Sequence, residues 1–129
     1  MKIIEQEEVR KLLQPKDCIQ LMAEALKGLE SGEYAQPARL ITVMPNTAKF
    51  GFMPAYVGDY FGAKVISAFA PNMGTKYPSH IGYVMLFESA HSTVAGMIEA
   101  GSITEIRTGA VSAAATDLLA RNCLLYTSD

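Results

Sequence analysis

The stretch from Gly101 to Arg121 constrains the fold of this chain more than any other. It reads GSITEIRTGAVSAAATDLLAR, a helical sequence whose middle, from Gly109 onward, consists largely of glycine and alanine. Because most side chains in its middle are small, such a helix can lie very close to another backbone, a sheet or a ligand. Ser102 and Glu105 have the spacing of a capping box, which predicts the start of the helix. The fold must therefore bring another segment or a ligand against this helix.

Arg107 falls near the expected start of the same helix. The helix dipole is positive at that end and disfavours a cation. An anion that is bound jointly by the guanidinium and the open amides of the first turn would compensate for this cost. An exposed ion pair with Asp or Glu explains the residue equally well at this point, since such pairs are common on protein surfaces.

The chain before this helix predicts two helices and then about five strands. The helices are expected over residues 5–13 and 15–31, and the second has Pro15 in its first turn and Gly32 as its C-terminal cap. The strands are expected over residues 38–44, 50–57, 63–69, 80–88 and 93–100, where apolar positions alternate or run together. Pro54 predicts an edge position or a bend in the second strand. Consecutive strands with short connections indicate an α+β fold with a mostly antiparallel or mixed sheet, flanked by the N-terminal helices and followed by the small-residue helix.

The last two strands are apolar on both faces, which indicates a sheet that is covered on both sides. The N-terminal helices can cover one face, and we expect a second copy of the chain to cover part of the other, which predicts a homodimer. The 129 residues are 50% apolar and 19% charged with a net charge of −2. This composition fits one globular domain and lacks the basic excess of a nucleic-acid-binding protein. No apolar run is long enough to cross a bilayer, and two cysteines form no disulfide framework, which suits the cytoplasm.

Three cations interrupt otherwise apolar segments, namely Arg39, Lys64 and Arg107. Burying an unpaired charge is costly, so each must reach water or share an anion. Each cation alone could extend to water. Three in one small domain favour a shared site for a carboxylate or phosphate.

Other kinds of chemistry find little support in the sequence. The two histidines, His80 and His91, have no cysteine or carboxylate spaced around them as metal ligands, so no metal site is expected. There is no glycine-rich dinucleotide turn, P-loop or nucleophile elbow. His80 borders a polar loop over residues 70–79 and is a candidate for binding, whereas Met53 is expected to be a packing residue.

Five pieces of the sequence, in order, resemble the N-terminal half of the ornithine cyclodeaminase/mu-crystallin family. They are PARL around Arg39, GFMPAY at 51–56, GAKVIS around Lys64, YPSHIG at the end of the polar loop, and SITEIRTGAVSAAATDLLAR. The resemblance implies that residues 1–121 are a substrate-binding and dimerisation domain that precedes a Rossmann domain. Residues 122–129, NCLLYTSD, do not resemble the family, so we expect a tail of other origin at a truncation.

The resemblance also implies an NAD(P)-dependent enzyme, in the first place an ornithine cyclodeaminase. Such an enzyme converts L-ornithine to L-proline and ammonia by an internal transfer and return of hydride. The alternatives are a ketimine reductase, an amino-acid dehydrogenase, or a non-enzymatic small-molecule-binding protein. The residues present do not decide which amino or keto acid is the substrate, nor whether NAD or NADP is used.

By the same resemblance, individual residues have expected roles. Arg39 and Lys64 would hold the substrate carboxylate, and Lys64 would assist proton transfer as the catalytic residue of this half. Arg107 would face both the substrate and the cofactor phosphate, and Ser79 and His80 would contact NAD. The family's catalytic aspartate and most cofactor contacts would lie in the Rossmann half, so we expect the 129-residue chain alone to have no turnover.

Overall fold

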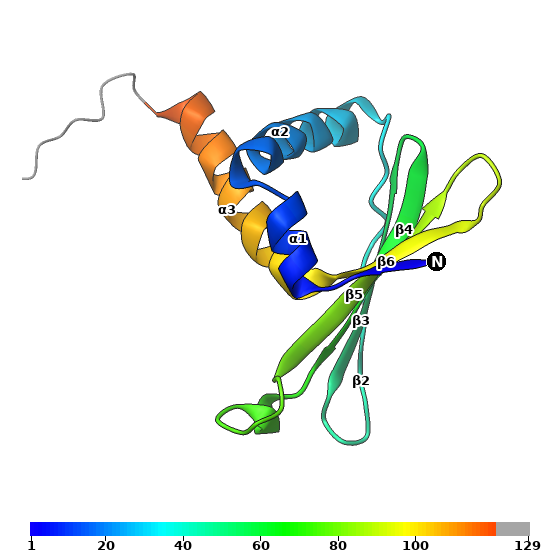
Figure 1. Cartoon of the computed structure of the whole chain (residues 1–129), viewed down its shortest axis with the longest axis vertical. Coiled ribbons are helices and arrows are strands. Elements are labelled where there is room, and N and C mark those ends of the chain that lie inside the picture. The colour runs from blue at the N-terminus through cyan, green and yellow to red at the C-terminus, as the bar shows by residue number, and fades with distance from the viewer. Residues whose placement is uncertain (121–129) are drawn as a thin grey trace, which may run out of the picture.

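The protein is described by a computed structural model, which covers residues 1–120. Within these residues, six strands form one sheet, and the helices lie on one side of it (Figure 1). In chain order the elements are β1 (Lys2–Ile4), α1 (Gln6–Leu12), α2 (Pro15–Ser31), β2 (Leu40–Val43), β3 (Lys49–Val57), β4 (Tyr60–Ala68), the 3-10 helix η1 (Ala70–Asn72), β5 (His80–Glu88), β6 (Val94–Glu99) and α3 (Ala100–Leu119). The predicted α+β fold, with a mostly antiparallel sheet and a final small-residue helix, is confirmed.

The sheet has the strand order β1-β6-β5-β4-β3-β2. The strands from β2 to β6 pair antiparallel with their neighbours in sequence, whereas β1 pairs parallel with β6 and sets Ile4 opposite Ile98. Strand β1 is not predicted from the sequence, because three residues are too few to display a period. Its pairing places the beginning of the chain beside the strand that leads into α3 (Figure 1).

Helices α2 and α3 pack against each other through small residues. Helix α2 has the predicted bounds, with Pro15 in its first turn and Gly32 in the left-handed conformation at its C-terminal cap (φ 78°). The buried positions in the two helices are Cys18 and Gly28 in α2 and Ala100, Ser102, Ala110 and Ala114 in α3. Because the buried side chains of α3 are short, the two helix axes can approach closely, as the composition of α3 predicts. Gly28 instead packs against the Tyr34 ring.

The start of α3 differs from the prediction. The helix begins at Ala100, and its N-cap is Glu99, whose carboxylate accepts hydrogen bonds from the amides of Gly101 and Ser102. Ser102 therefore lies inside the first turn and is not the cap, and Glu105 forms an ion pair with Arg10 of α1 instead of closing a capping box. The capping-box prediction is wrong because the carboxylate at the end of β6 reaches the free amides first.

Pro54 lies in β3 without breaking the strand, which runs through to Val57. Strand β2 pairs with β3 only as far as Phe52, and the next contact on that side is an isolated bridge between Ala35 and Tyr56. The outer side of β3 is thus unpaired around Pro54, which agrees with the predicted edge position. A short gap in the ladder results at this point of the sheet.

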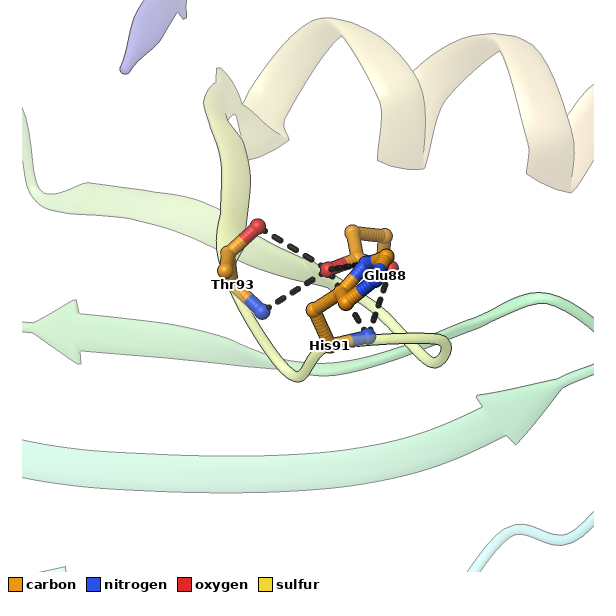
Figure 2. A network of polar contacts seen from close by, with 3 residues as sticks. All are labelled: Glu88, His91 and Thr93. Atoms are coloured by element: carbon orange, nitrogen blue, oxygen red, sulfur yellow. Dashed lines mark hydrogen bonds and ion pairs between the residues drawn. The ribbon is translucent and has the colours of Figure 1, made fainter.

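The turn between β5 and β6 is held by one carboxylate. Glu88 accepts hydrogen bonds from the backbone amides of His91 and Thr93 and from the Thr93 hydroxyl, at 2.9–3.1 Å (Figure 2). These hydrogen bonds lower the pKa of the Glu88 carboxyl, with those from the Thr93 and His91 amides the largest causes. His91 itself is exposed and lies in this turn.

The face of the sheet that points away from the helices is apolar, and residues 1–120 leave it uncovered. Cross-strand partners share a face, so the register assigns to it Leu40, Phe50, Phe52, Tyr56, Phe61, Val65, Ile81, Tyr83, Met85, Phe87 and Met97. Phe61 and Phe87 stack with ring centroids 5.2 Å apart, yet Phe52 and Ile81 remain 42% and 49% exposed. We call this surface the open face.

Candidate functional site

A hollow of about 600 Å³ lies where four segments meet on the helix side of the sheet. It is bounded by α2, by the segment before β2, by the middle of β3 and β4, and by the second turn of α3. Its lining residues are Met22, Gln36, Pro37, Ala38, Arg39, Met53, Pro54, Ala55, Lys64, Ile103, Thr104 and Arg107. All three cations singled out in the sequence line it, and no Asp or Glu is among these residues. We call it the cationic hollow.

Lys64 is the most enclosed of the three cations. It projects from the middle of β4 toward α3, where its Nζ donates a hydrogen bond of 3.4 Å to Thr104 Oγ1. Burial lowers the pKa of the Lys64 ammonium, and the charges of Arg107 and Arg39 lower it further. A bound anion would relieve the repulsion among these three cations, because a nearby negative charge favours the protonated form of a lysine.

Arg39 and Arg107 line the hollow from two different segments. Arg39 is exposed and comes from the segment just before β2, beside the gap in the ladder around Pro54. Arg107 is also exposed and stands about two turns inside α3, so it is not the first-turn residue that the sequence predicts. The first-turn amides of Gly101 and Ser102 are also not free to share an anion with Arg107, because both donate hydrogen bonds to the Glu99 carboxylate. An anion would be bound here by side chains.

Several lining residues are not identified by the sequence analysis. Thr104 is three residues before Arg107, a spacing that puts both on the same face of α3. Met53 lies directly across the ladder from Lys64, and Met22 reaches the hollow from α2. The spacing of three residues from Arg107 could have identified Thr104 from the sequence. The two methionines, by contrast, look like ordinary core residues in the sequence.

A second, smaller hollow of about 260 Å³ adjoins the first and shares Thr104 with it. Its lining residues are Ile66, His80, Gly82, Ala100, Gly101, Thr104 and Glu105. His80 is exposed at the start of β5, so the structure brings it to the α3 side of the sheet near the cations. Ser79 is half-buried, and its carbonyl accepts a hydrogen bond from the Phe69 amide; it is not among the lining residues of either hollow.

Two further observations concern metal binding and membrane-spanning helices. Within residues 1–120, no group of three or more His, Cys, Asp or Glu side chains is arranged to hold a metal ion. None of the helices in this part of the chain has the length and apolar character needed to span a membrane.

The sequence profile of the ornithine cyclodeaminase/mu-crystallin family matches residues 1–123. The chain belongs to this family. Among curated proteins, the ketimine reductase mu-crystallin of Mus musculus is 34% identical over 101 residues, and that of Rattus norvegicus is 32% identical. The match covers 76% of this chain but only 32% of either relative, so the chain spans about a third of their length.

Solved structures of the family share the fold. A Thermococcus litoralis Δ1-pyrroline-2-carboxylate reductase in complex with NADH and L-proline matches with a TM-score of 0.85 and 28% identity, over 94% of this chain and 38% of that protein. The iminosuccinate reductase of Paracoccus denitrificans in complex with NAD+ matches with a TM-score of 0.88, over 95% of this chain and 39% of that protein. The latter is 18% identical, so its likeness is one of fold.

Proposed function

We propose that the cationic hollow binds the carboxylate of a small α-amino, α-imino or α-keto acid. The observation that supports this proposal is the meeting of Arg39, Lys64 and Arg107 around one hollow whose lining has no acidic side chain. Two guanidinium groups and an ammonium match the charge of a carboxylate and supply more donors than it can accept. Arg39 and Lys64 are the proposed carboxylate ligands, and Arg107 is proposed to reach both this group and a cofactor phosphate.

We further propose that a protein carrying this chain together with a dinucleotide-binding part is an NAD(P)-dependent enzyme that acts at the α-carbon of the bound acid. The nicotinamide would supply or accept the hydride. Lys64 has a lowered pKa next to the proposed carboxylate position, which suits a group that exchanges a proton with the substrate. His80 borders the adjoining hollow and is proposed to contact the cofactor, as is the neighbouring Ser79.

Two classes of reaction would use such a site. One is the cyclodeamination of L-ornithine to L-proline, and the other is the reduction of a ketimine or the dehydrogenation of an amino acid. A non-enzymatic member of the family would keep the carboxylate site and have no turnover. In a longer protein that contains this chain and a Rossmann domain, a change in nicotinamide absorbance detects ketimine reduction or amino-acid dehydrogenation. Cyclodeamination returns the hydride and gives no net absorbance change, so it is detected by the release of ammonia and proline from L-ornithine. The lack of both signals would favour the non-enzymatic proposal.

The carboxylate site can be tested on the chain itself. We expect 2-oxopentanoate to bind saturably in a calorimetric or NMR titration, and Arg39→Gln to weaken that binding by about tenfold or more, as is usual for a charge-assisted hydrogen bond. Lys49→Gln is the matched control, because Lys49 is another cation of the same sheet that does not line the hollow. Equal loss in both variants, or no saturable binding to the wild type, would overturn the proposal.

The open face supports the further proposal of a homodimer. A row of aromatic and aliphatic side chains of this extent is usually covered by a partner. A structural neighbour of the chain, an archaeal alanine dehydrogenase with bound NAD, is described as a dimer. We expect light scattering to give twice the chain mass at micromolar concentration, and Phe52→Glu, on the open face, to give the monomer mass. A folded wild-type monomer would contradict this.

A further inference from the structure

The cationic hollow has a side that carries no charge. Beside the cations, its lining includes Met53 from β3, Met22 from α2 and Ile103 from α3. Met53 is the direct cross-strand partner of Lys64, so its side chain stands beside the ammonium on the same face of the sheet. Whatever is attached to a carboxylate held at Lys64 would extend along these three apolar side chains.

Packing keeps this wall apolar. Next to Met53 on the same face lies Gly51, and a Cβ built there would meet Ile66 Cγ1 at 2.7 Å and the Met53 methyl at 3.7 Å. A side chain at this position would have to displace Ile66, which disfavours an acidic group next to Met53.

A second positive charge on the ligand would be unfavourable at this wall for two reasons. An ammonium placed against methionine and isoleucine loses hydration without gaining an acceptor. The three cations already in the lining also repel it, and no carboxylate in the lining offsets them. An uncharged aliphatic or cyclic side chain suffers neither penalty and gains apolar contact.

We propose that the hollow selects α-amino, α-imino or α-keto acids whose side chain is uncharged, and excludes diamino acids, with Met53, Met22 and Ile103 as the selecting wall. This inference rests on the carboxylate site proposed above. It ranks ketimine reduction or amino-acid dehydrogenation ahead of ornithine cyclodeamination for a protein that carries this chain. It also assigns Met53 a role in specificity, where the sequence predicts packing alone.

L-Norvaline and L-ornithine form the matched pair of probes, because they share one carbon skeleton and differ only in the terminal ammonium. In titrations of the 129-residue chain near neutral pH, we expect norvaline to bind at least about tenfold more tightly than ornithine. Met53→Glu should reduce or reverse the preference for norvaline, because the new carboxylate can pair with the terminal ammonium of ornithine. Val57→Glu is the control, since Val57 is exposed on the same strand and face but does not line the hollow.

The outcomes separate this inference from the proposed function. Equal affinity for norvaline and ornithine would overturn the selection and leave the carboxylate site standing. Failure of 2-oxopentanoate and of both amino acids to bind would overturn the carboxylate site, and the selection with it. If Met53→Glu does not fold, Met22→Glu places a carboxylate on the same wall from α2. If a folded variant with a glutamate on this wall, either Met53→Glu or Met22→Glu, keeps the full preference for norvaline, the wall does not select.

Discussion

Replacing Glu99 with alanine should destabilise the start of α3, the segment that carries Thr104 and Arg107 into the cationic hollow. The Glu99 carboxylate accepts hydrogen bonds from the amides of Gly101 and Ser102, the latter at 2.9 Å. The replacement leaves two amides of the first turn without this acceptor and removes a negative charge from the positive end of the helix. Loss of an N-cap typically costs ~1 kcal/mol, and two charge-assisted hydrogen bonds argue for about 1–2 kcal/mol here.

The loss should depend on pH. Burial raises the pKa of the Glu99 carboxyl, but hydrogen bonds from Ser102 and Gly101 outweigh it, so the net shift is downward. A carboxyl whose pKa is lower in the folded than in the unfolded protein stabilises fully above the unfolded pKa of about 4.3. That stabilisation is lost as the pH falls through the folded pKa. The difference between wild type and Glu99→Ala should therefore be complete at pH 6–7 and shrink below about pH 4.

Thermal and urea unfolding measure this effect. We expect the melting temperature to fall by roughly 4–8 °C at pH 7, and 2-oxopentanoate to bind more weakly because Thr104 and Arg107 are less firmly positioned. Glu105→Ala is the control from the same helix, since it removes only the exposed ion pair with Arg10 and should cost under about 0.5 kcal/mol. If Glu99→Ala unfolds like the wild type at pH 7, or if Glu105→Ala costs as much, the capping role of Glu99 is refuted.

Three further substitutions probe the frame around the site. Glu88→Ala removes the acceptor that holds the β5–β6 turn, so amide hydrogen exchange at His91 and Thr93 should accelerate by about tenfold. Unchanged exchange would contradict the role of Glu88. Gly28→Ala should cost about 1–3 kcal/mol, because its Cβ would lie 2.3 Å from the Tyr34 ring, whereas Gly109→Ala meets nothing within 4 Å and should stabilise α3 by up to about 1 kcal/mol. Urea unfolding compares the two, and a shift of the same sign in both would contradict the close packing at Gly28.

Local sequence signals predicted the elements that local chemistry determines. Pro15 and Gly32 gave the bounds of α2 because a fixed φ favours a first turn and a left-handed residue ends a helix. The alternation of apolar residues located the five antiparallel strands, and Pro54 correctly indicated an unpaired strand side. The predictions that failed concern features that depend on residues far away in the sequence. Strand β1 needs β6 to exist at all, and the α3 cap comes from a strand residue whose type is uncommon at that position.

The candidate site was predictable in its charges and not in its shape. Counting cations in apolar segments was enough to single out Arg39, Lys64 and Arg107, because buried charge is costly wherever it occurs. Their common location and the wall beside them follow from sheet register. Nothing in the sequence says that Met53 faces Lys64 across the ladder, so its place in the hollow could not be foreseen.

The parallel pairing of β1 with β6 has a consequence for the order in which the protein folds during synthesis. Residues 2–4 are translated before their partners at 96–98, which emerge only after strands β2 to β5 have been made. The antiparallel strands can form one after another through short turns, whereas β1 must wait and then close a long loop. Until it docks, the outer edge of β6 offers unpaired backbone groups to other nascent chains. Chaperone dependence should therefore be greatest between the emergence of β6 from the ribosome and the docking of β1.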